Sequence, residues 1–152
     1  MRKQKVYIFI QARMGSKRLP GKVLKKIQGK TLIEILIHRL KKSKNSNDII
    51  VLTSNSKSDD VLVNFLKLKS IKYFRGNEDD VLDRYYNALQ IYSCDYIVRI
   101  TGDCPLLDPN LLDKVIDLTL KSESDYCSNI FNDSFPDGQD IEVFKNKVLL
   151  NA

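Results

Sequence analysis

The chain has 152 residues, of which 43% are hydrophobic and 29% are charged, a composition ordinary for one globular domain spanning 1–152. Its longest apolar run covers only residues 6–10, so a membrane-spanning helix is not predicted, and the N-terminus lacks a signal-peptide pattern. We therefore expect a cytoplasmic protein with no membrane partner. The three cysteines fit neither a disulfide framework nor a set of zinc ligands, and we expect them to be reduced.

The net charge of +6 is distributed unevenly along the chain. Residues 1–44 contain 14 Lys and Arg against one acidic residue, whereas residues 45–152 contain 11 against 18. This asymmetry favours a localised anion-binding site over a uniformly basic surface. A surface that binds nucleic acid would combine basic with aromatic side chains, and no Phe, Tyr or Trp occurs between positions 11 and 44. We expect no nucleic-acid partner.

The first predicted strand leads directly into a basic loop that contains glycines. Residues 6–10 are a continuous apolar run, typical of a strand that is buried on both faces. The next stretch, 11–30, has six Lys and Arg between positions 13 and 26 and glycines at 15, 21 and 29. Such a loop after a first strand favours a phosphate-binding site. It is not a P-loop, because Val23 follows Lys22. The residues alone leave a solvated loop without a ligand as the alternative.

Helical and extended patterns alternate along the rest of the chain. Thr31 and Glu34 form a capping-box pattern, and Asp108–Pro109 is an N-cap and N1 pair. Ser58 and Asn77 are candidate N-caps of two further helices. Apolar stripes with helical spacing lie at 32–40, 61–66, 81–92 and 109–120, and further strands are predicted at 49–52, 71–74 and 96–100.

This alternation predicts an α/β fold with a mostly parallel sheet that is covered on both sides. Ligands bind such sheets at the carboxyl ends of the strands, where the loop after 6–10, the pair Thr53–Ser54 and the segment 101–105 come together. In the last of these, Asp103 follows Gly102 and can coordinate a Mg²⁺ ion that bridges phosphate oxygens. The spacing leaves open that Asp103 only makes a turn.

Four motifs stand in order over nearly the whole chain: IFIQARMGSKRLPGKVLKKIQGKTLIE at 8–34, RGNEDDVLDRYYNA at 75–88, RITGDCPLLDP at 99–109 and FPDGQDIEVF at 135–144. Together they resemble the sugar-acid cytidylyltransferases of the acylneuraminate and 3-deoxy-manno-octulosonate type, most of all the spore-coat polysaccharide synthesis branch. The resemblance implies a three-layer α/β/α nucleotidyltransferase fold that is Rossmann-like, of the nucleotide-diphospho-sugar transferase type. It also implies a Mg²⁺-dependent transfer of CMP from CTP to a sugar acid, with release of pyrophosphate, for cell-surface polysaccharide synthesis.

The same resemblance implies which residues form the site. Arg13 and Lys22 are implied triphosphate ligands and Asp103 is the implied metal ligand, and these three are the implied catalytic residues. The implied nucleotide-binding residues are Gln11, Ala12, Arg13, Met14, Gly15, Ser16, Arg18, Lys22, Arg84, Thr101 and Gly102. In the last motif we expect substrate-binding residues at Asp137, Gln139 and Asp140.

The chain departs from the family pattern at its C-terminal end. Related enzymes use a second metal aspartate in a stretch resembling V-D-T-P-E-D-L, and this chain stops at Ala152 before such a stretch. Asp140 and Glu142 alternate with apolar residues and could supply an acid to the substrate side, or they could face solvent beside a turn at Asp137–Gly138. We expect a chain that lacks its C-terminal portion, binds nucleotide and has weak or no catalytic activity.

Two other functions remain open at this level. One is a non-catalytic domain that binds a nucleotide or a nucleotide-sugar, and the other is a glycosyltransferase of related fold. The expected partners are CTP and a sugar acid, and the sequence does not say which sugar acid. The oligomeric state is also open, with a homodimer as one alternative.

Overall fold

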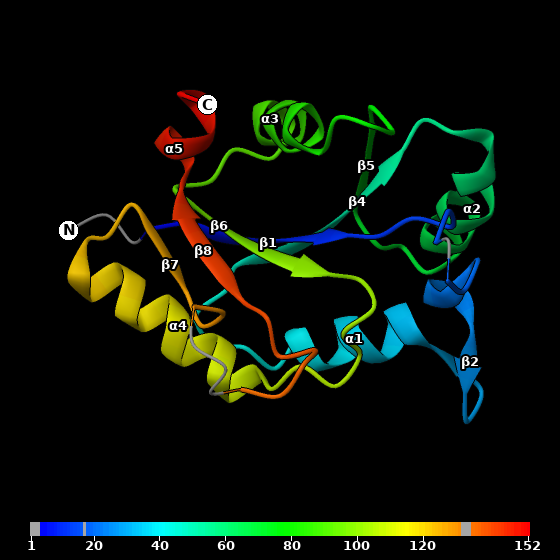
Figure 1. Ribbon diagram of the computed structural model, residues 1–152, viewed down its shortest axis with the longest axis horizontal. Coiled ribbons are helices and arrows are strands. Elements are labelled where there is room, and N and C mark those ends of the chain that lie inside the picture. Colours follow the sequence, from blue (N-terminus) through cyan, green and yellow to red (C-terminus); the bar gives the residue numbers. More distant parts are fainter. Residues whose placement is uncertain (1–3, 17, 132–134) are drawn as a thin grey trace.

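A six-stranded sheet forms the centre of the protein (Figure 1), seen in a computed structural model that describes residues 4–16, 18–131 and 135–152. The strand order is β5-β4-β1-β6-β8-β7. The first four of these strands are parallel, β8 is antiparallel to β6, and β7 is antiparallel to β8. The predicted mostly parallel sheet is confirmed. The strands are β1 (Val6–Gln11), β4 (Asp48–Ser54), β5 (Tyr73–Gly76), β6 (Tyr96–Thr101), β7 (Tyr126–Ser128) and β8 (Glu142–Lys145).

Helices cover both faces of the sheet, with α3 and α5 above it and α1 and α4 below it in Figure 1. Among the described residues, the α-helices are α1 (Leu32–Leu40), α2 (Asp60–Leu68), α3 (Val81–Ile91), α4 (Pro109–Ser122) and α5 (Asn146–Leu150). Two short 3-10 helices and a small hairpin complete the described chain: η1 (Lys22–Leu24), η2 (Lys57–Asp59), β2 (Lys26–Ile27) and β3 (Lys30–Thr31). The α/β/α layering that the sequence predicts is therefore present. In the described chain, no helix is both long and apolar enough to cross a membrane.

Strand β1 shows why the sheet needs helices on both faces. Ile8 and Ile10 are fully buried in a cluster with side chains of α1, α2 and α4, whereas Phe9 between them is fully buried in a second cluster with side chains of α3. Successive side chains of a strand point to opposite faces, so an apolar residue at every position requires a cover on each face. The continuous apolar run therefore places β1 in the middle of the sheet.

Two of the predicted helix starts are confirmed in detail. The Thr31 side chain accepts a hydrogen bond from the Glu34 amide, and the Glu34 side chain accepts one from the Thr31 amide, which together make a capping box. Asp108 caps α4 through a 2.9 Å bond from the Asn110 amide, with Pro109 in the first turn. These short-range signals succeed because both partners lie within three residues of each other.

Two other predicted caps are wrong. Ser58 donates its hydroxyl to Ser56 and caps no helix, since a turn of 3-10 helix precedes α2. Asn77 instead accepts hydrogen bonds from two amides before α3, and the N-cap of that helix is Asp80. The third predicted strand is also displaced, because β5 begins at Tyr73 and ends at Gly76. Each segment offers several polar side chains within three residues, and local pattern does not choose among them.

Candidate functional site

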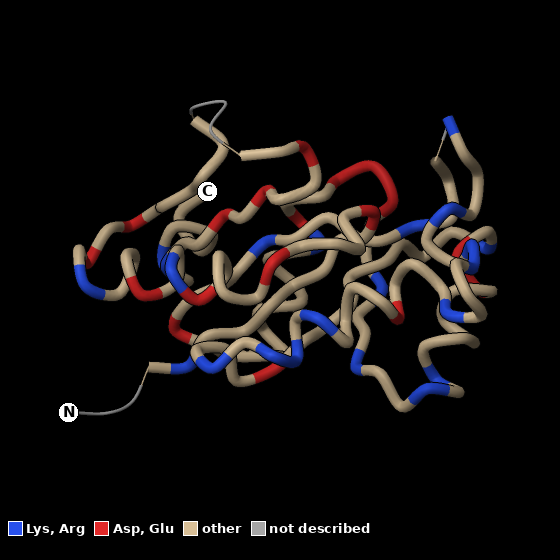
Figure 2. The backbone as a smooth tube through the Cα atoms, turned by 90° about the horizontal axis from the view of Figure 1, so that it is seen from below, with Lys and Arg blue, Asp and Glu red and all other residues tan. Residues whose placement is uncertain are grey.

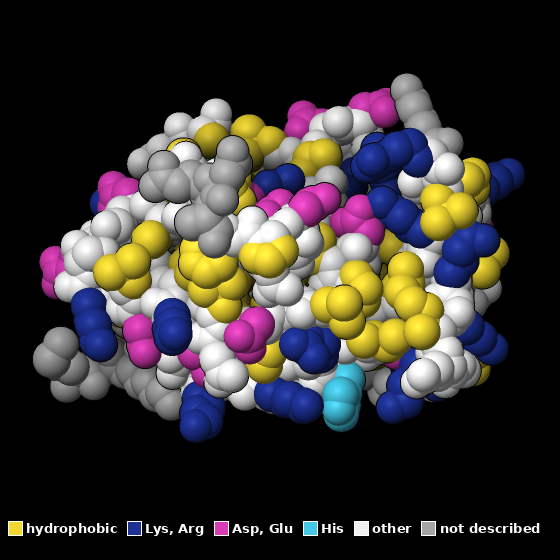
Figure 3. All heavy atoms as spheres, turned by 60° about the horizontal axis from the view of Figure 1, so that its bottom comes forward, with side chains coloured by type: hydrophobic (Ala, Val, Ile, Leu, Met, Phe, Trp, Pro, Cys, Tyr) yellow, Lys and Arg dark blue, Asp and Glu magenta, His cyan; other side chains and the backbone are white. Residues whose placement is uncertain are grey.

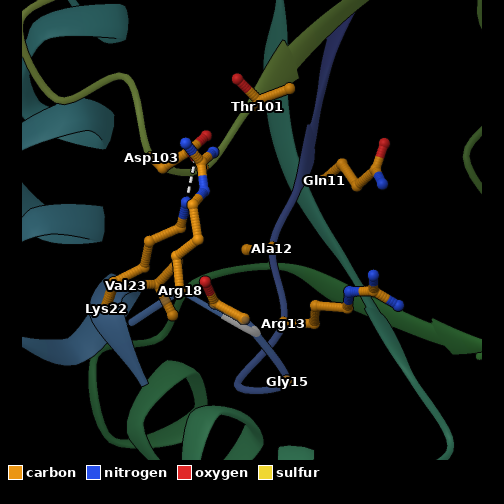
Figure 4. Close-up of a pocket in the computed structure, with 11 residues that line it drawn as sticks. Gln11, Ala12, Arg13, Gly15, Arg18, Lys22, Val23, Thr101 and Asp103 are labelled. Carbon is orange, nitrogen blue, oxygen red and sulfur yellow. Dashed lines mark hydrogen bonds and ion pairs between the residues drawn. The ribbon is translucent and has the colours of Figure 1, made fainter. Parts of the chain in front are cut away.

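A cavity of about 330 Å³ opens at the carboxyl ends of β1 and β6. This is the edge at which ligands bind sheets of this kind. Its lining residues include nine of the eleven predicted nucleotide-binding positions, the exceptions being Met14 and Arg84. The lining is Gln11, Ala12, Arg13, Gly15, Ser16, Arg18, Lys22, Val23, Thr101, Gly102 and Asp103 (Figure 4).

Lys22 and Arg18 extend toward Asp103 in this cavity (Figure 4). The Lys22 ammonium donates a hydrogen bond to the Asp103 carboxylate and forms an ion pair with it. Burial alone would raise the pKa of Asp103, but the bond and charge of Lys22 hold that pKa below its ordinary value. Asp103 is therefore a carboxylate at neutral pH. The ion pair joins two residues 81 positions apart, which the sequence had assigned to phosphate and metal.

Arg13 lies on the other side of the loop. Its side chain points away from Lys22, Arg18 and Asp103 in Figure 4, although it lines the same cavity. The two predicted triphosphate ligands, Arg13 and Lys22, therefore stand on opposite sides of the loop. Lys and Arg positions are frequent at the right-hand end of the molecule in Figure 2. At the upper right of Figure 3, Lys and Arg side chains, in dark blue, lie next to Asp and Glu side chains, in magenta.

The backbone of Met14 closes the loop between these two cations. The Met14 carbonyl accepts 2.9 Å hydrogen bonds from the amides of both Ser16 and Gly21. Gly21 has a φ of +67°, a conformation that glycine adopts without strain. The loop thus returns on itself, and Lys22 follows directly after a residue that Met14 holds. Met14 does not line the cavity, and it acts through its peptide groups.

Gly102 allows the loop to approach β6 closely. Its amide donates a 2.8 Å hydrogen bond to the Gln11 carbonyl. A Cβ atom at position 102 would lie 2.8 Å from the Ala12 Cβ and 3.1 Å from the Gln11 oxygen. The chain turns at Gly102 and Asp103, where the Cys104 amide donates a 3.3 Å hydrogen bond to the Thr101 carbonyl. The φ of Gly102 is not positive, so close packing is what requires a glycine here.

A second cavity of about 550 Å³ shares Arg18, Thr101 and Asp103 with the first. Its far wall is the segment 136–140, which contains all three predicted substrate-binding residues. Asp137 and Asp140 are exposed. Gln139 lines the cavity, but its side chain is engaged with protein: it accepts from the Asp108 amide at 2.9 Å and donates to the Leu106 carbonyl at 3.1 Å. Gln139 therefore fixes this wall to the segment after β6.

Arg84 is buried outside the cavities. Its side chain has 0% exposure, and its Nε and Nη2 atoms donate to the Asn77 and Glu78 carbonyls. The Nη1 atom has no hydrogen-bond partner. Burial lowers the pKa of Arg84, and the charge of Arg13 acts in the same direction. Arg84 holds the segment after β5, and its contact with a nucleotide stays a prediction.

Glu142 belongs to the sheet and does not line either cavity. It forms an ion pair with Arg99 on the neighbouring strand and accepts a 2.7 Å hydrogen bond from the Tyr126 hydroxyl. Ile141 and Val143 on either side are fully buried. Of the two acids that the sequence placed on the substrate side, only Asp140 lines a cavity.

The donor atoms of the site fit a metal ion that arrives with phosphate. Among the described residues, no group of three His, Cys, Asp or Glu side chains is placed to hold a metal alone. Mg²⁺ commonly binds through one or two protein carboxylates together with phosphates and water. Asp103, with its side chain 37% exposed beside two cations, matches that limited donor set. Cys104 beside it carries a neutral thiol, because burial raises its pKa.

Two residues that support the site were missed by the sequence reasoning. The Arg39 side chain in α1 donates a 2.8 Å hydrogen bond to the Leu107 carbonyl, in the segment that follows Asp103. Asp59 is 1% exposed and accepts a 2.7 Å bond from the Met14 amide. The only sequence signal for Asp59 is a polar segment after a strand. That signal does not indicate which of Asp59 and Asp60 is buried and contacts the loop.

Comparison with known proteins gives consistent matches. The profile of the family described as Cytidylyltransferase matches residues 7–150. The chain is 39% identical over 125 residues to the spore coat polysaccharide biosynthesis protein SpsF of Bacillus subtilis, covering 80% of this chain and 52% of that protein. It is 33% identical over 115 residues to 3-deoxy-manno-octulosonate cytidylyltransferase 2 of Hydrogenovibrio crunogenus, covering 74% of this chain and 46% of that protein. The chain thus spans about half the length of the curated relatives it matches.

A solved structure agrees with the fold in detail. A cytidylyltransferase from Leptospira borgpetersenii superimposes with a TM-score of 0.91 at 40% sequence identity. The match covers 97% of this chain and 63% of that one. The two chains therefore share the fold over nearly the whole of this chain.

Proposed function

Because the chain belongs to the cytidylyltransferase family, we propose that its site binds CTP with Mg²⁺ and that the protein transfers CMP to a sugar acid, releasing pyrophosphate. The observation that carries the proposal is the convergence of Lys22 and Arg18 on Asp103 at the carboxyl edge of the sheet. Two relatives, a spore coat polysaccharide biosynthesis protein and a 3-deoxy-manno-octulosonate cytidylyltransferase, support a sugar acid as the acceptor. Location in the cytoplasm stays a prediction.

In the proposed reaction, a sugar hydroxyl oxygen attacks the α-phosphorus of CTP. A bond forms between that oxygen and phosphorus, the bond from phosphorus to the bridging oxygen breaks, pyrophosphate leaves with the electron pair, and the hydroxyl proton is released to water. Such transfers depend on positioning and on cations that stabilise charge on the phosphate oxygens. Lys22, Arg18 and Arg13 are the cations that line the cavity. No nucleophilic side chain is required, consistent with the neutral thiol of Cys104.

The ion pair between Lys22 and Asp103 couples the proposed binding of the triphosphate to the proposed binding of Mg²⁺. A triphosphate that takes Lys22 as its ligand removes the partner of the Asp103 carboxylate and brings further negative charge beside it. A cation must then offset that charge, because like charges in a partly buried site repel strongly. Bound Mg²⁺ would supply that charge and draw electrons from the phosphate oxygens. Asp103 is the residue that would hold it.

The second cavity is the proposed acceptor site. It meets the first at Arg18, Thr101 and Asp103, so an acceptor bound there would lie next to a nucleotide bound in the first cavity. Asp137 and Asp140 line its far wall and can accept hydrogen bonds from sugar hydroxyls. Arg18 is the lining cation available to the acceptor's carboxylate among the described residues.

Thermal unfolding in the presence of CTP, GTP, UTP or ATP, with and without Mg²⁺, tests the proposal. We expect stabilisation that is selective for CTP and requires Mg²⁺. Stabilisation that is absent, or equal for all four nucleotides, contradicts it.

The variant Asp103→Asn should change CTP affinity in opposite directions with Mg²⁺ and with a chelator. With Mg²⁺ it should bind CTP more weakly than the wild type, because the metal loses its carboxylate. With a chelator it should bind CTP more tightly than the wild type, because a repelling charge is gone and Lys22 is free for phosphate. If Asp103 only shapes a turn, the effect of the substitution is the same with Mg²⁺ and with chelator.

A further inference from the structure

Asp59 is a buried carboxylate that the proposed reaction does not use. It lies at the end of η2, directly before α2, and its exposure is 1%. An aspartate at this position would ordinarily cap the helix, yet no side-chain capping bond is present. Its carboxylate oxygens instead accept hydrogen bonds from other segments, so the buried charge has a role other than capping α2.

The two carboxylate oxygens of Asp59 accept hydrogen bonds from backbone amides in different parts of the chain. Oδ1 accepts a 2.7 Å bond from the Met14 amide, in the loop after β1. Oδ2 accepts 2.9 Å bonds from the Ser54 amide and the Thr53 hydroxyl and a further bond from the Ser54 hydroxyl, at the end of β4. The carboxylate therefore ties the loop to the sheet. Burial alone would raise the pKa of Asp59, but these bonds hold it below its ordinary value, so the tie is charged at neutral pH.

Met14 is the point at which one contact can set both ends of the loop. Its amide lies in the peptide that follows Arg13, and its carbonyl holds the amide of Gly21, which precedes Lys22. Fixing the Met14 peptide groups thus fixes where the chain places Arg13 and Lys22. These two cations stand on opposite sides of the loop, and a triphosphate that contacts both needs their separation to be constant.

We propose that Asp59 is a positioning residue for the triphosphate, which acts through the Met14 peptide groups to set the directions of Arg13 and Lys22. This role rests on the proposed function, since it presupposes that the loop binds phosphates. Asp59 itself does not line the cavity, so it acts through Met14.

The substitution Asp59→Asn breaks this arrangement with little change in size. An amide has one acceptor oxygen, whereas Met14 and Ser54 present one backbone N–H to each carboxylate oxygen. Whichever way the amide turns, its NH₂ group faces one of the two N–H groups. Asp60→Asn is the matched control. Asp60 is the next residue, its side chain is 51% exposed, and its ion pair is with Arg75 on the surface.

The experiment measures the affinities of wild type, D59N and D60N for CTP and for CMP by calorimetry with Mg²⁺, beside their thermal unfolding. We expect D59N to weaken CTP binding by about tenfold or more, the loss associated with a charge-assisted hydrogen bond. CMP lacks the β- and γ-phosphates, so its affinity should fall less, and D60N should match the wild type for both. The rise in the ratio of the CTP to the CMP dissociation constant is the signature of positioning.

A purely structural role gives a different result. It lowers both affinities by the same factor in step with the loss of stability, and that outcome, or unchanged CTP binding by D59N, overturns the role of Asp59. Should D59N fail to fold, Ser54→Ala removes one hydroxyl bond to the same carboxylate and should raise the same ratio by a smaller factor. An unchanged ratio in S54A then overturns the role. Wild type that does not bind CTP overturns the proposed function together with this inference.

Discussion

The two walls of the site carry opposite charge but are built in the same way. The loop after β1 presents Arg13, Arg18 and Lys22, whereas the segment 136–140 presents Asp137 and Asp140. In each wall a less exposed side chain does the fastening, Asp59 for the loop and Gln139 for the segment. Charges that meet a ligand and groups that hold the backbone are thus on different residues. Substituting a charged residue that meets a ligand and substituting a residue that holds the backbone should therefore produce different defects.

The contrast in charge also divides the chemistry. A wall of cations suits the phosphates of a nucleotide, because charge-assisted hydrogen bonds to phosphate are strong. A wall of carboxylates repels phosphate and suits hydroxyl groups, which donate hydrogen bonds to it. The two walls meet at Asp103, which lines both cavities, so its charge would act on both the nucleotide and the acceptor.

The largest effect should come from removing a cation from the phosphate wall. Lys22→Met should weaken CTP binding by about 1 to 3 kcal/mol, because a charge-assisted contact is lost. Asp140→Asn, the matched change on the opposite wall, should leave the affinity for CTP unchanged. Calorimetric titration of each variant with CTP and Mg²⁺ measures both. If Asp140→Asn weakens CTP binding as much as Lys22→Met, the two walls do not divide the ligands as proposed.

A smaller effect should come from the packing between the loop and β6. Gly102→Ala should lower the free energy of unfolding by about 1 to 2 kcal/mol, because its Cβ meets the backbone and Cβ of the loop. Gly15→Ala is the control for stability alone, since a Cβ there has no neighbour within 4 Å. Denaturant unfolding of both variants gives the comparison. Equal stabilities for the two would show that the close approach at Gly102 adapts without strain.

The smallest effect should come from Glu34, which lies outside both walls. Hydrogen bonds from Lys69 and from the Thr31 amide lower its pKa to about 2, from 4.5. Its charge therefore stabilises the fold fully above pH 4.5, and this contribution is lost as the pH falls toward 2. Glu34→Gln keeps an acceptor for the capping box and should lower stability at pH 7 by about 0.5 kcal/mol, as for an exposed ion pair.

Unfolding of wild type and Glu34→Gln across that pH range tests the sign. The difference between their unfolding free energies should shrink as the pH falls from 4.5 toward 2. A difference that stays constant means that the charge of Glu34 contributes nothing. One that grows toward low pH contradicts the direction of the pKa shift.

Local signals predicted the elements well where one residue had one available partner. The apolar run at Val6 to Ile10 predicted a covered strand, and Thr31 with Glu34 predicted the start of a helix, and both are present. The same reasoning failed at Ser58 and Asn77, because several neighbouring polar side chains compete for the same amides. Competition of this kind is decided by the packing of the whole helix, which a short window does not contain.

Most of the site could be predicted because the family motifs and the strand-end rule pointed to the same residues. Arg84 was different. Its motif indicated the nucleotide, but the fold buries the entire guanidinium against the segment after β5. Asp59 was not predicted at all, since its partners Met14 and Ser54 lie on separate segments. A contact across 45 positions leaves no trace in local periodicity.

The sequence by itself determined the alternation of the main strands and helices as far as α4 and the basic loop at the carboxyl edge of the sheet. These features follow from apolar spacing, capping residues and charge, which act over a few residues. The tertiary structure alone decided that Arg13 and Lys22 stand on opposite sides of the loop, that Gly102 is required for close packing, and that a buried carboxylate holds Met14. Each of these depends on distances between segments, and distances are fixed only when the sheet is assembled.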